Sequence, residues 1–317
     1  MKRAWVAAAA ALVLAVLALV ASFPGGRADL SSPEDTAFLW DGLYLGKQTF
    51  ADVPYVSTPY EVVHEMIRMA DVRADDVVYD LGCGDGRLVI EAARLTGCRG
   101  VGVDIDGELI ALCRSRAKAA GVDERTRFVT QDFFETDVRE ATVMLIYLLP
   151  EINLRLRPKF LREMKPGSRV VSHVFDMGDW RPDARSLVGW RSVYLWVIPA
   201  NVTGDWSWAP AEEPGQSHTL RIRQDFQRIR GELIRAGGRI GISAPRLSGD
   251  RITFHVVQDV GGVPVRTQYE GVVEGNTITG TVVSGSGVRA VRWHAVRDPS
   301  TAGRIDEGPR ISELSRD

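Results

Sequence analysis

Three acidic residues stand at or near the ends of short apolar runs in the first half of the chain. Asp80 follows "VVY", Asp104 follows "GVGV", and Asp132 follows "FVTQ". If these runs are parallel strands, their carboxyl ends meet at one edge of a sheet, where open α/β sheets bind ligands. A carboxylate at such an edge can accept hydrogen bonds from ribose hydroxyls or from an amine. The sequence therefore predicts a site for a nucleoside-containing ligand at this edge.

The loop after the first run, "DLGCGDG", indicates which ligand that is. Its glycines at 82, 84 and 86 let a ligand approach the backbone just before a helix N-terminus. A nicotinamide-dinucleotide fingerprint has the spacing G-x-G-x-x-G, whereas this loop reads G-x-G-x-G. Carboxylates at Asp80 and Asp85 would repel a pyrophosphate and attract the ammonium and sulfonium groups of S-adenosylmethionine. We therefore predict S-adenosylmethionine as the cofactor and disfavour a dinucleotide-dependent reductase.

The motifs "DLGCGDG", "GVDID" and "QD" together resemble the class I, seven-strand family of S-adenosylmethionine-dependent methyltransferases. The resemblance covers about half of the chain, residues 53–199. It implies that Asp104 binds the ribose and that Asp132 faces the adenine. It also implies which residues surround the methionine part of the cofactor: Asp80, Gly82, Gly84 and Asp85. Gly86, Ile105 and Phe133 are assigned to the same cofactor site.

The segment "PYVSTPYEVVHEMIRMA" precedes the glycine loop and resembles the lysine methyltransferases of the disruptor-of-telomeric-silencing class. It is more similar to the membrane-associated branch that methylates lysines of the adenine nucleotide translocase and of the ATP-synthase c subunit. The later stretch "LYLLPEINLRLRPKFLREMKPGSRVVSH" also resembles that branch. By this resemblance Tyr55 and Thr58 close over the methionine end of the cofactor. A simpler interpretation is that Thr58, before Pro59, caps a helix.

The acceptor pocket is expected after the fourth and fifth apolar runs. The residues assigned to catalysis are Tyr147, Glu151 and Asn153, and Phe175 and Trp180 could form a wall, although Trp180 could equally be a packing residue. A dry aromatic pocket would favour loss of the lysine proton, because burial disfavours the charged form. The Asp/Asn-Pro-Pro-aromatic motif of DNA amino-methylases is missing at Tyr147–Pro150, and no cluster of acids indicates a metal. His173 could serve as a base for an O-methylase, so a small molecule or lipid remains an alternative acceptor.

The alternation of apolar runs and helix-like stretches over residues 36–199 predicts a parallel α/β sheet, and the family resemblance implies that this is a Rossmann-like methyltransferase domain. Residues 200–297 instead read as an antiparallel β meander, in a barrel or a sandwich. Residues 24–35 form a linker, and residues 298–317 are expected to be a disordered tail. "INLRLRPKFLREMKPG" predicts a helix that breaks or starts at Pro158, and "SVYLWVIP" predicts an antiparallel edge.

Residues 1–23 contain a charge-free apolar run from Ala4 to Phe23, which is long enough to span a bilayer. We expect a single N-terminal membrane anchor, with a cleaved secretory signal as the alternative. Export would separate the chain from cytosolic S-adenosylmethionine, so an exported, non-catalytic binding protein with a methyltransferase-like fold is a competing hypothesis.

A net charge of −2 gives no basic field for nucleic acid. The three cysteines lack a CxxC pair, which disfavours a zinc site.

Overall fold

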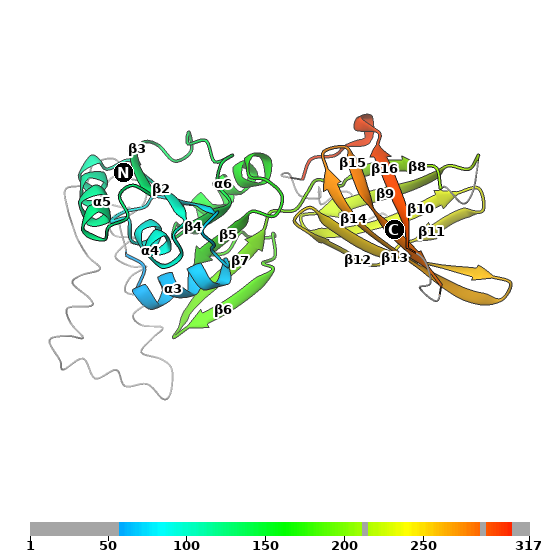
Figure 1. Cartoon of the computed structure of the whole chain (residues 1–317), viewed down its shortest axis with the longest axis horizontal. Helices are drawn as coiled ribbons and strands as arrows, with labels where there is room; N and C mark the ends of the chain where they lie inside the picture. The colour runs from blue at the N-terminus through cyan, green and yellow to red at the C-terminus, as the bar shows by residue number, and fades with distance from the viewer. Residues whose placement is uncertain (1–56, 211–214, 286–289, 306–317) are drawn as a thin grey trace, which may run out of the picture. The chain divides into compact units, whose positions relative to one another are not determined.

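The computed structural model describes residues 57–210, 215–285 and 290–305, which build two β-sheets (Figure 1). Several expectations lie outside the described residues: the N-terminal anchor or signal, the linker, Tyr55 and the final twelve residues. Within residues 57–210, 215–285 and 290–305, no helix combines the length and apolar character needed to cross a membrane.

The first sheet has the strand order β3-β2-β1-β4-β5-β7-β6. Its parallel strands are β1 (Val77–Leu81), β2 (Arg99–Asp104), β3 (Thr126–Thr130), β4 (Val143–Ile146) and β5 (Arg169–His173). Two antiparallel strands complete the sheet, β7 (Arg191–Val197) beside β5 and β6 (Ala184–Val188) at the edge. The α/β prediction is confirmed. The "SVYLWVIP" segment is antiparallel as expected, but β6 rather than β7 forms the edge.

In the part of the chain that the structure describes, four helices cover this sheet: α3 (Tyr60–Met69), α4 (Arg87–Thr96), α5 (Gly107–Ala119) and α6 (Pro150–Glu163). Buried side chains of α3, α4 and α5 share one apolar cluster with Val78, Val143 and Val171, which face one side of the sheet. Buried side chains of α6 pack against Tyr79 and Met144 on the other side. Because both faces are covered, β1 and β4 are buried along their whole length, as their continuous apolar sequences indicate.

The helix α6 corrects the expectation at Pro158. The helix begins at Pro150, in a first turn where a missing N–H group costs no intrahelical bond, and it continues through Pro158 to Glu163. Pro158 removes one backbone hydrogen bond from the helix interior. Burial of Ile152, Leu156 and Phe160 against the sheet offsets that loss and keeps the helix continuous.

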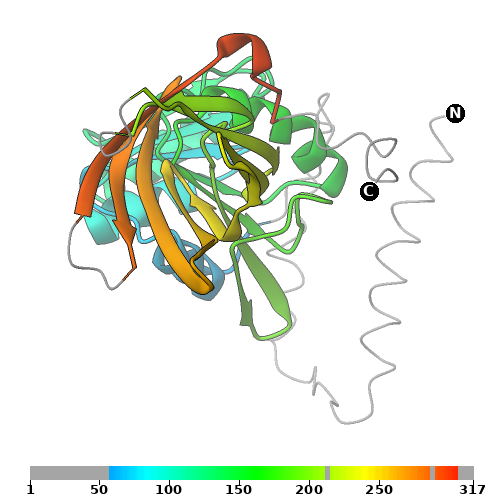
Figure 2. The same ribbon diagram turned by 90° about the vertical axis from the view of Figure 1, so that its right-hand side faces the viewer.

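The second sheet is antiparallel, in the order β11-β10-β9-β8-β16-β15-β14-β13-β12. Its strands are β8 (Gly204–Trp208), β9 (His218–Asp225), β10 (Arg228–Arg235), β11 (Gly238–Gly241), β12 (Ser243–Ser248), β13 (Arg251–Val260), β14 (Val263–Glu274), β15 (Thr277–Ser284) and β16 (Ala290–Arg297). Figure 2 shows these strands, coloured from yellow-green to red, curling round. The curl brings β12 near β10 and β11 near β13, so the sheet nearly closes.

Aromatic side chains fill the interior of this second sheet. Trp208, Tyr269 and Trp293 contact one another through ring edges, and Phe254 stacks on Tyr269 at 4.7 Å between ring centroids. All four are buried, so the interior is a packed core. The ordered chain also extends beyond the expected domain end at 297. A 3₁₀ helix follows at Pro299–Thr301, and Ile305 is buried. The expectation of a disordered tail is therefore wrong for residues 298–305.

Candidate cofactor and acceptor site

The glycine loop connects β1 to α4 and folds back onto the end of β2. The N–H groups of Gly82 and Cys83 both donate to the Val103 carbonyl, at 2.8 and 3.0 Å. The N–H group of Gly84 donates to Oδ2 of Asp104 at 2.9 Å. These bonds fix the loop at the carboxyl edge of the sheet, which is where parallel α/β sheets bind their ligands.

Gly86 shows why the loop requires glycine. Its φ angle of 78° lies in the left-handed region. A Cβ atom on this residue would lie 2.9 Å from Sγ of Cys113 and 2.9 Å from Phe128. Any side chain would therefore clash with the packed layer of α5 and β3 beneath the loop.

Asp80 is the most electrostatically unbalanced residue of this edge. Its side chain is buried, with 2 % of the residue exposed. No group in the described part of the chain donates a hydrogen bond to its carboxylate or forms an ion pair with it. Burial, together with the negative charges of Asp104 and Asp85, raises its pKa well above the usual value. A buried carboxylate in this state fits a cationic ligand group, since the cation would supply the missing charge.

Asp85 is in a different state, although it lies only five residues away. Its carboxylate pairs with Arg87 at 2.6 Å and also with Arg116. Burial opposes ionisation of Asp85, but the hydrogen bonds and charges of the two arginines outweigh it and hold the pKa below the usual value. The sequence predicts that Asp85 attracts a cationic ligand, but in the structure its carboxylate already pairs with these two arginines. Arg87 also donates to the Thr58 carbonyl at 2.9 Å, which links the segment before α3 to the loop.

The carboxyl ends of β2 and β3 carry the residues expected near the nucleoside. Asp104 is partly buried, and its second oxygen accepts the Asp106 N–H group at 3.0 Å. Burial raises its pKa. Ile105, beside it, is 51 % exposed. These side chains can offer a carboxylate for ribose and an apolar surface for a base.

Asp132 and Phe133 follow β3 on the same edge. Asp132 is exposed and accepts the Phe134 N–H group at 2.8 Å, which shapes a turn. Phe133 lies against Phe134, with 4.8 Å between ring centroids. A Cβ atom built on Gly82 would lie 4.0 Å from the Phe133 ring, so this ring stands directly beside the glycine loop.

A second cluster lies at the carboxyl ends of β4 and β5. Oγ1 of Thr58 and Nδ1 of His173 are 3.3 Å apart, which joins the start of α3 to the end of β5. The ring of Tyr147 lies 4.1 Å from that of His173 and 6.2 Å from that of Phe175, measured between centroids. Among the described residues, Nε2 of His173 has no hydrogen-bond partner although it is buried.

The two polar rings of this cluster are uncharged near pH 7. Burial, and secondarily the charge of Arg191, lowers the pKa of His173 to about 4. Burial raises the pKa of Tyr147, which keeps the phenol protonated. The cluster is thus an aromatic, low-polarity environment with one imidazole nitrogen left to bind a further group.

The remaining expected acceptor residues are in different situations. Glu151 is exposed in the first turn of α6. Asn153 is fully buried, and its amide nitrogen lies 3.2 Å from Ser172 Oγ and 3.4 and 3.3 Å from the carbonyls of Phe175 and Asp176. It therefore positions the loop after β5.

Trp180 does not form a wall of the acceptor pocket. Its residue exposure is 0 %, and its ring packs against Trp196 and Phe226. The indole N–H group donates to the side-chain oxygen of Gln227 at 2.9 Å. The side chain is fully used in packing, so the alternative interpretation of Trp180 as a packing residue is the correct one.

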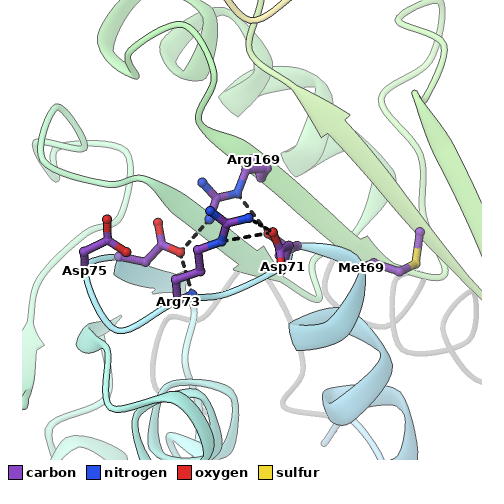
Figure 3. A pocket seen from close by; sticks show the side chains of 7 residues that line it. Met69, Asp71, Arg73, Asp75 and Arg169 are labelled. Atoms are coloured by element: carbon purple, nitrogen blue, oxygen red, sulfur yellow. Dashed lines mark hydrogen bonds and ion pairs between the residues drawn. The ribbon is translucent and has the colours of Figure 1, made fainter.

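A hollow of about 330 Å³ lies at the opposite edge of the first sheet (Figure 3). Asp76, just before β1, accepts hydrogen bonds there from Thr142 at 2.6 Å and from Arg169 at 2.6 Å. Figure 3 shows Asp71, Arg73 and Arg169 directed toward one another. Asp71 pairs with Arg73 and Asp76 pairs with Arg169, and the amino edge of a parallel sheet is not where such folds bind ligands, so this hollow is a structural clamp.

Comparison with known proteins assigns a family to this arrangement. The ANTKMT methyltransferase domain matches residues 80–184. A protein-lysine N-methyltransferase of Saccharolobus islandicus is 47 % identical over 151 residues, which cover 46 % of this chain and 94 % of that enzyme. The chain belongs to the protein-lysine N-methyltransferase family. It is an S-adenosylmethionine-dependent methyltransferase, as the glycine loop and the strand-end acids predicted.

Other relatives of this methyltransferase are named for their protein substrates. The Xenopus laevis lysine N-methyltransferase of the ATP synthase c subunit is 31 % identical, over 41 % of this chain and 57 % of that enzyme. The adenine nucleotide translocase lysine N-methyltransferase of Mus musculus is 30 % identical, over 48 % of this chain and 65 % of that enzyme. A crystal structure of an RNA methyltransferase from Salinibacter ruber with S-adenosyl-L-homocysteine shows 50 % identity, with a TM-score of 0.46, covering 46 % of this chain and 96 % of that one.

Proposed function

We propose that this methyltransferase transfers a methyl group to the ε-amino group of a lysine in a membrane-associated protein. The observation that carries the lysine assignment is the 47 % identity that extends over 94 % of the Saccharolobus islandicus lysine methyltransferase. The membrane assignment is supported by the relatives named for the ATP synthase c subunit and for adenine nucleotide translocase, and by the apolar run at residues 4–23. The proposed location is a single N-terminal anchor.

The cofactor side of the site is proposed from charge and position. Asp80 accepts the ammonium group, since its buried carboxylate has no partner within the described residues. Asp104 accepts the ribose hydroxyls, and Asp132, Ile105 and Phe133 hold the adenine. Asp85 contributes indirectly, because its ion pair with Arg87 fixes the start of α4 under the loop.

The acceptor side is proposed around Tyr147, His173 and Phe175. When bound, the cofactor supplies an electrophilic methyl group on a sulfonium. The aromatic rings surround the lysine side chain with low polarity, which favours its uncharged amine form. Nε2 of His173 then accepts a hydrogen bond from the amine, provided that Nδ1 carries the hydrogen toward Thr58. With a pKa of about 4, His173 orients the amine rather than retaining its proton. Positioning of the amine lone pair accounts for most of the rate enhancement.

The test uses the full chain, isotope-labelled S-adenosylmethionine and a membrane fraction. The expected result is label in a membrane protein, recovered after acid hydrolysis as methyl-lysine. Asp104→Ala serves as the inactive control, because it removes the carboxylate bonded to the Gly84 N–H group. Label in lipid, in a small molecule or in RNA, with none in methyl-lysine, would contradict the lysine proposal. No cofactor binding by the folded chain would support the non-catalytic alternative.

A further inference from the structure

The hairpin between β6 and β7 presents two large apolar side chains to solvent. We refer to residues 187–191 as the hairpin tip. Leu187 is 61 % exposed and Trp190 is 68 % exposed, the highest value among the large apolar residues that the structure describes. A tryptophan in this position costs solubility and contributes nothing to the core, so an exposed apolar tip of this kind indicates an interaction site.

The register of the sheet places this tip at the carboxyl edge. His173, the last residue of β5, pairs with Val193 of β7, and β7 runs antiparallel to β5. The hairpin closes at the pair Val188–Arg191, two residues beyond that point. The tip therefore extends past the end of β5, on the same side as the cluster of Thr58, Tyr147 and His173.

The chemistry of the tip fits the interface of a lipid bilayer. Tryptophan and leucine partition into the boundary between headgroups and acyl chains, and arginine beside them binds anionic headgroups. Arg185 is exposed on the same hairpin strand as Leu187, two residues away, and can face such headgroups. The Arg191 guanidinium, 4.3 Å from the Trp190 ring centroid, is largely buried and pairs with Glu61 at 3.9 Å, so it supports the tryptophan ring from the protein side. Side chains two residues apart on a strand share one face, so Arg185 and Leu187 project together.

The path of the chain agrees with this orientation. The described residues begin at Ser57, next to Thr58, whose hydroxyl lies at the end of β5. The sequence that precedes this point carries the apolar run from Ala4 to Phe23. Ser57 and Thr58 therefore lie at the same edge of the sheet as the hairpin tip.

We propose that the β6–β7 hairpin tip inserts Leu187 and Trp190 into the interface of an anionic lipid bilayer and so turns the acceptor cluster toward the membrane surface. The inference rests on the proposed function, in which the acceptor lysine belongs to a membrane-associated protein. A lysine close to the headgroups would then reach Tyr147 and His173 without leaving the membrane.

The test places a fluorescent label at the hairpin tip in the full chain. Leu187→Cys is labelled with an NBD group, and Val263→Cys, at an equally exposed position of the second sheet (61 %), is the matched control. The native Cys83, Cys98 and Cys113 are buried and so leave labelling selective. The protein is mixed with vesicles of phosphatidylcholine and phosphatidylglycerol that carry nitroxide-labelled lipids.

The expected result is a blue-shifted emission and strong nitroxide quenching for the label at 187, and neither for the label at 263. Adding Trp190→Ser to Leu187→Cys should reduce the quenching to the level of the control. Equal quenching at 187 and 263, or quenching that Trp190→Ser leaves unchanged, would overturn the proposal. A label at 187 that responds to a detergent-solubilised membrane protein but not to vesicles would show a protein-docking tip and would also overturn it.

Cofactor binding is measured on the same samples by calorimetry. In the order of the sheet, β6 lies four strands away from β1, which leads into the glycine loop, so Trp190→Ser should leave the dissociation constant for S-adenosylmethionine unchanged. Loss of cofactor binding by the wild type would count against the proposed function, whereas the quenching result would still decide the membrane proposal by itself.

Discussion

The buried carboxylate of Asp80, which has no partner among the described residues, leads to a prediction in which stability and binding change in opposite directions. Asp80→Asn keeps the shape of the side chain and removes the charge. The residue is 2 % exposed, and the described residues offer its carboxylate no hydrogen-bond donor. The ligand-free protein should therefore become more stable, because the substitution removes a buried charge that has no partner among those residues.

The size of the effect follows from the burial. An unsatisfied buried group costs about 1–3 kcal/mol, so the free energy of unfolding should rise by about that amount. For a domain of 150–250 residues this corresponds to an increase in melting temperature of roughly 2–12 °C. The affinity for S-adenosylmethionine should fall by at least about 30-fold, since breaking a buried charge pair costs about 2 kcal/mol or more.

The raised pKa of Asp80 determines the pH range in which the Asp80→Asn substitution increases stability. The pKa of Asp80 is raised in the folded protein, so the wild-type residue favours folding at acidic pH and loses that contribution as pH rises through the folded value. The stability gain from Asp80→Asn should thus be largest at neutral pH and vanish below about pH 4, where both states of the wild type are protonated. Cofactor affinity of the wild type should weaken on acidification.

Differential scanning calorimetry without ligand and titration calorimetry with S-adenosylmethionine measure both effects. Asp75→Asn is the matched control, because Asp75 is an exposed aspartate just before the other end of the same strand. The control should change neither quantity. A melting temperature that falls in Asp80→Asn, or a dissociation constant that stays the same, would refute the argument that this carboxylate is uncompensated without ligand.

Three further substitutions test the scaffold around the site. Asp76→Ala should lower the free energy of unfolding by about 2–3 kcal/mol at neutral pH, because Arg169 and Thr142 lose their acceptor. Hydrogen bonds and the Arg169 charge outweigh burial and hold the Asp76 pKa low, so this difference, measured by urea denaturation, should disappear as pH falls through the folded pKa. Gly86→Ala should lower the free energy of unfolding by about 1–3 kcal/mol, because the added Cβ atom would lie 2.9 Å from Sγ of Cys113. Thermal melts followed by circular dichroism measure this change, and an unchanged stability would contradict the close packing. Trp180→Ala should cost about 3–5 kcal/mol and leave cofactor affinity intact, and a selective loss of binding would refute its assignment to the core.

The positions of Asp80, Asp104 and Asp132 could be predicted because the ends of buried strands can be recognised from the sequence alone. A continuous apolar run predicts a buried strand, and parallel strands necessarily bring their carboxyl ends to one edge. The glycine spacing then distinguished the ligand class from a dinucleotide. These inferences need only local sequence and the rules of parallel sheets.

Which of these carboxylates forms an ion pair within the protein could not be predicted in the same way. Asp80 and Asp85 look alike in sequence, yet Arg116 reaches Asp85 from α5, thirty-one residues further along the chain. Arginines are common on helix surfaces, so nothing in the sequence marks this one as a partner. Trp180 likewise looks like a loop residue until Phe226, from a segment far along the chain, stacks against its ring at 5.7 Å. Long-range partners decide both cases.

The pairing of β8 with β16 has a consequence for how the chain acquires its structure. Val296 and Arg297 of β16 pair with Ser207 and Trp206 of β8. One of the two neighbours of β8, the first strand of the second sheet, is therefore its last strand, β16. During synthesis from the N-terminus, every strand of the first sheet has emerged before β16 exists. One edge of β8, which carries Trp206 and Trp208, must then stay unpaired until the final strand arrives. A ribosome that stalls within the second sheet would release a chain with a complete methyltransferase sheet and an aggregation-prone remainder.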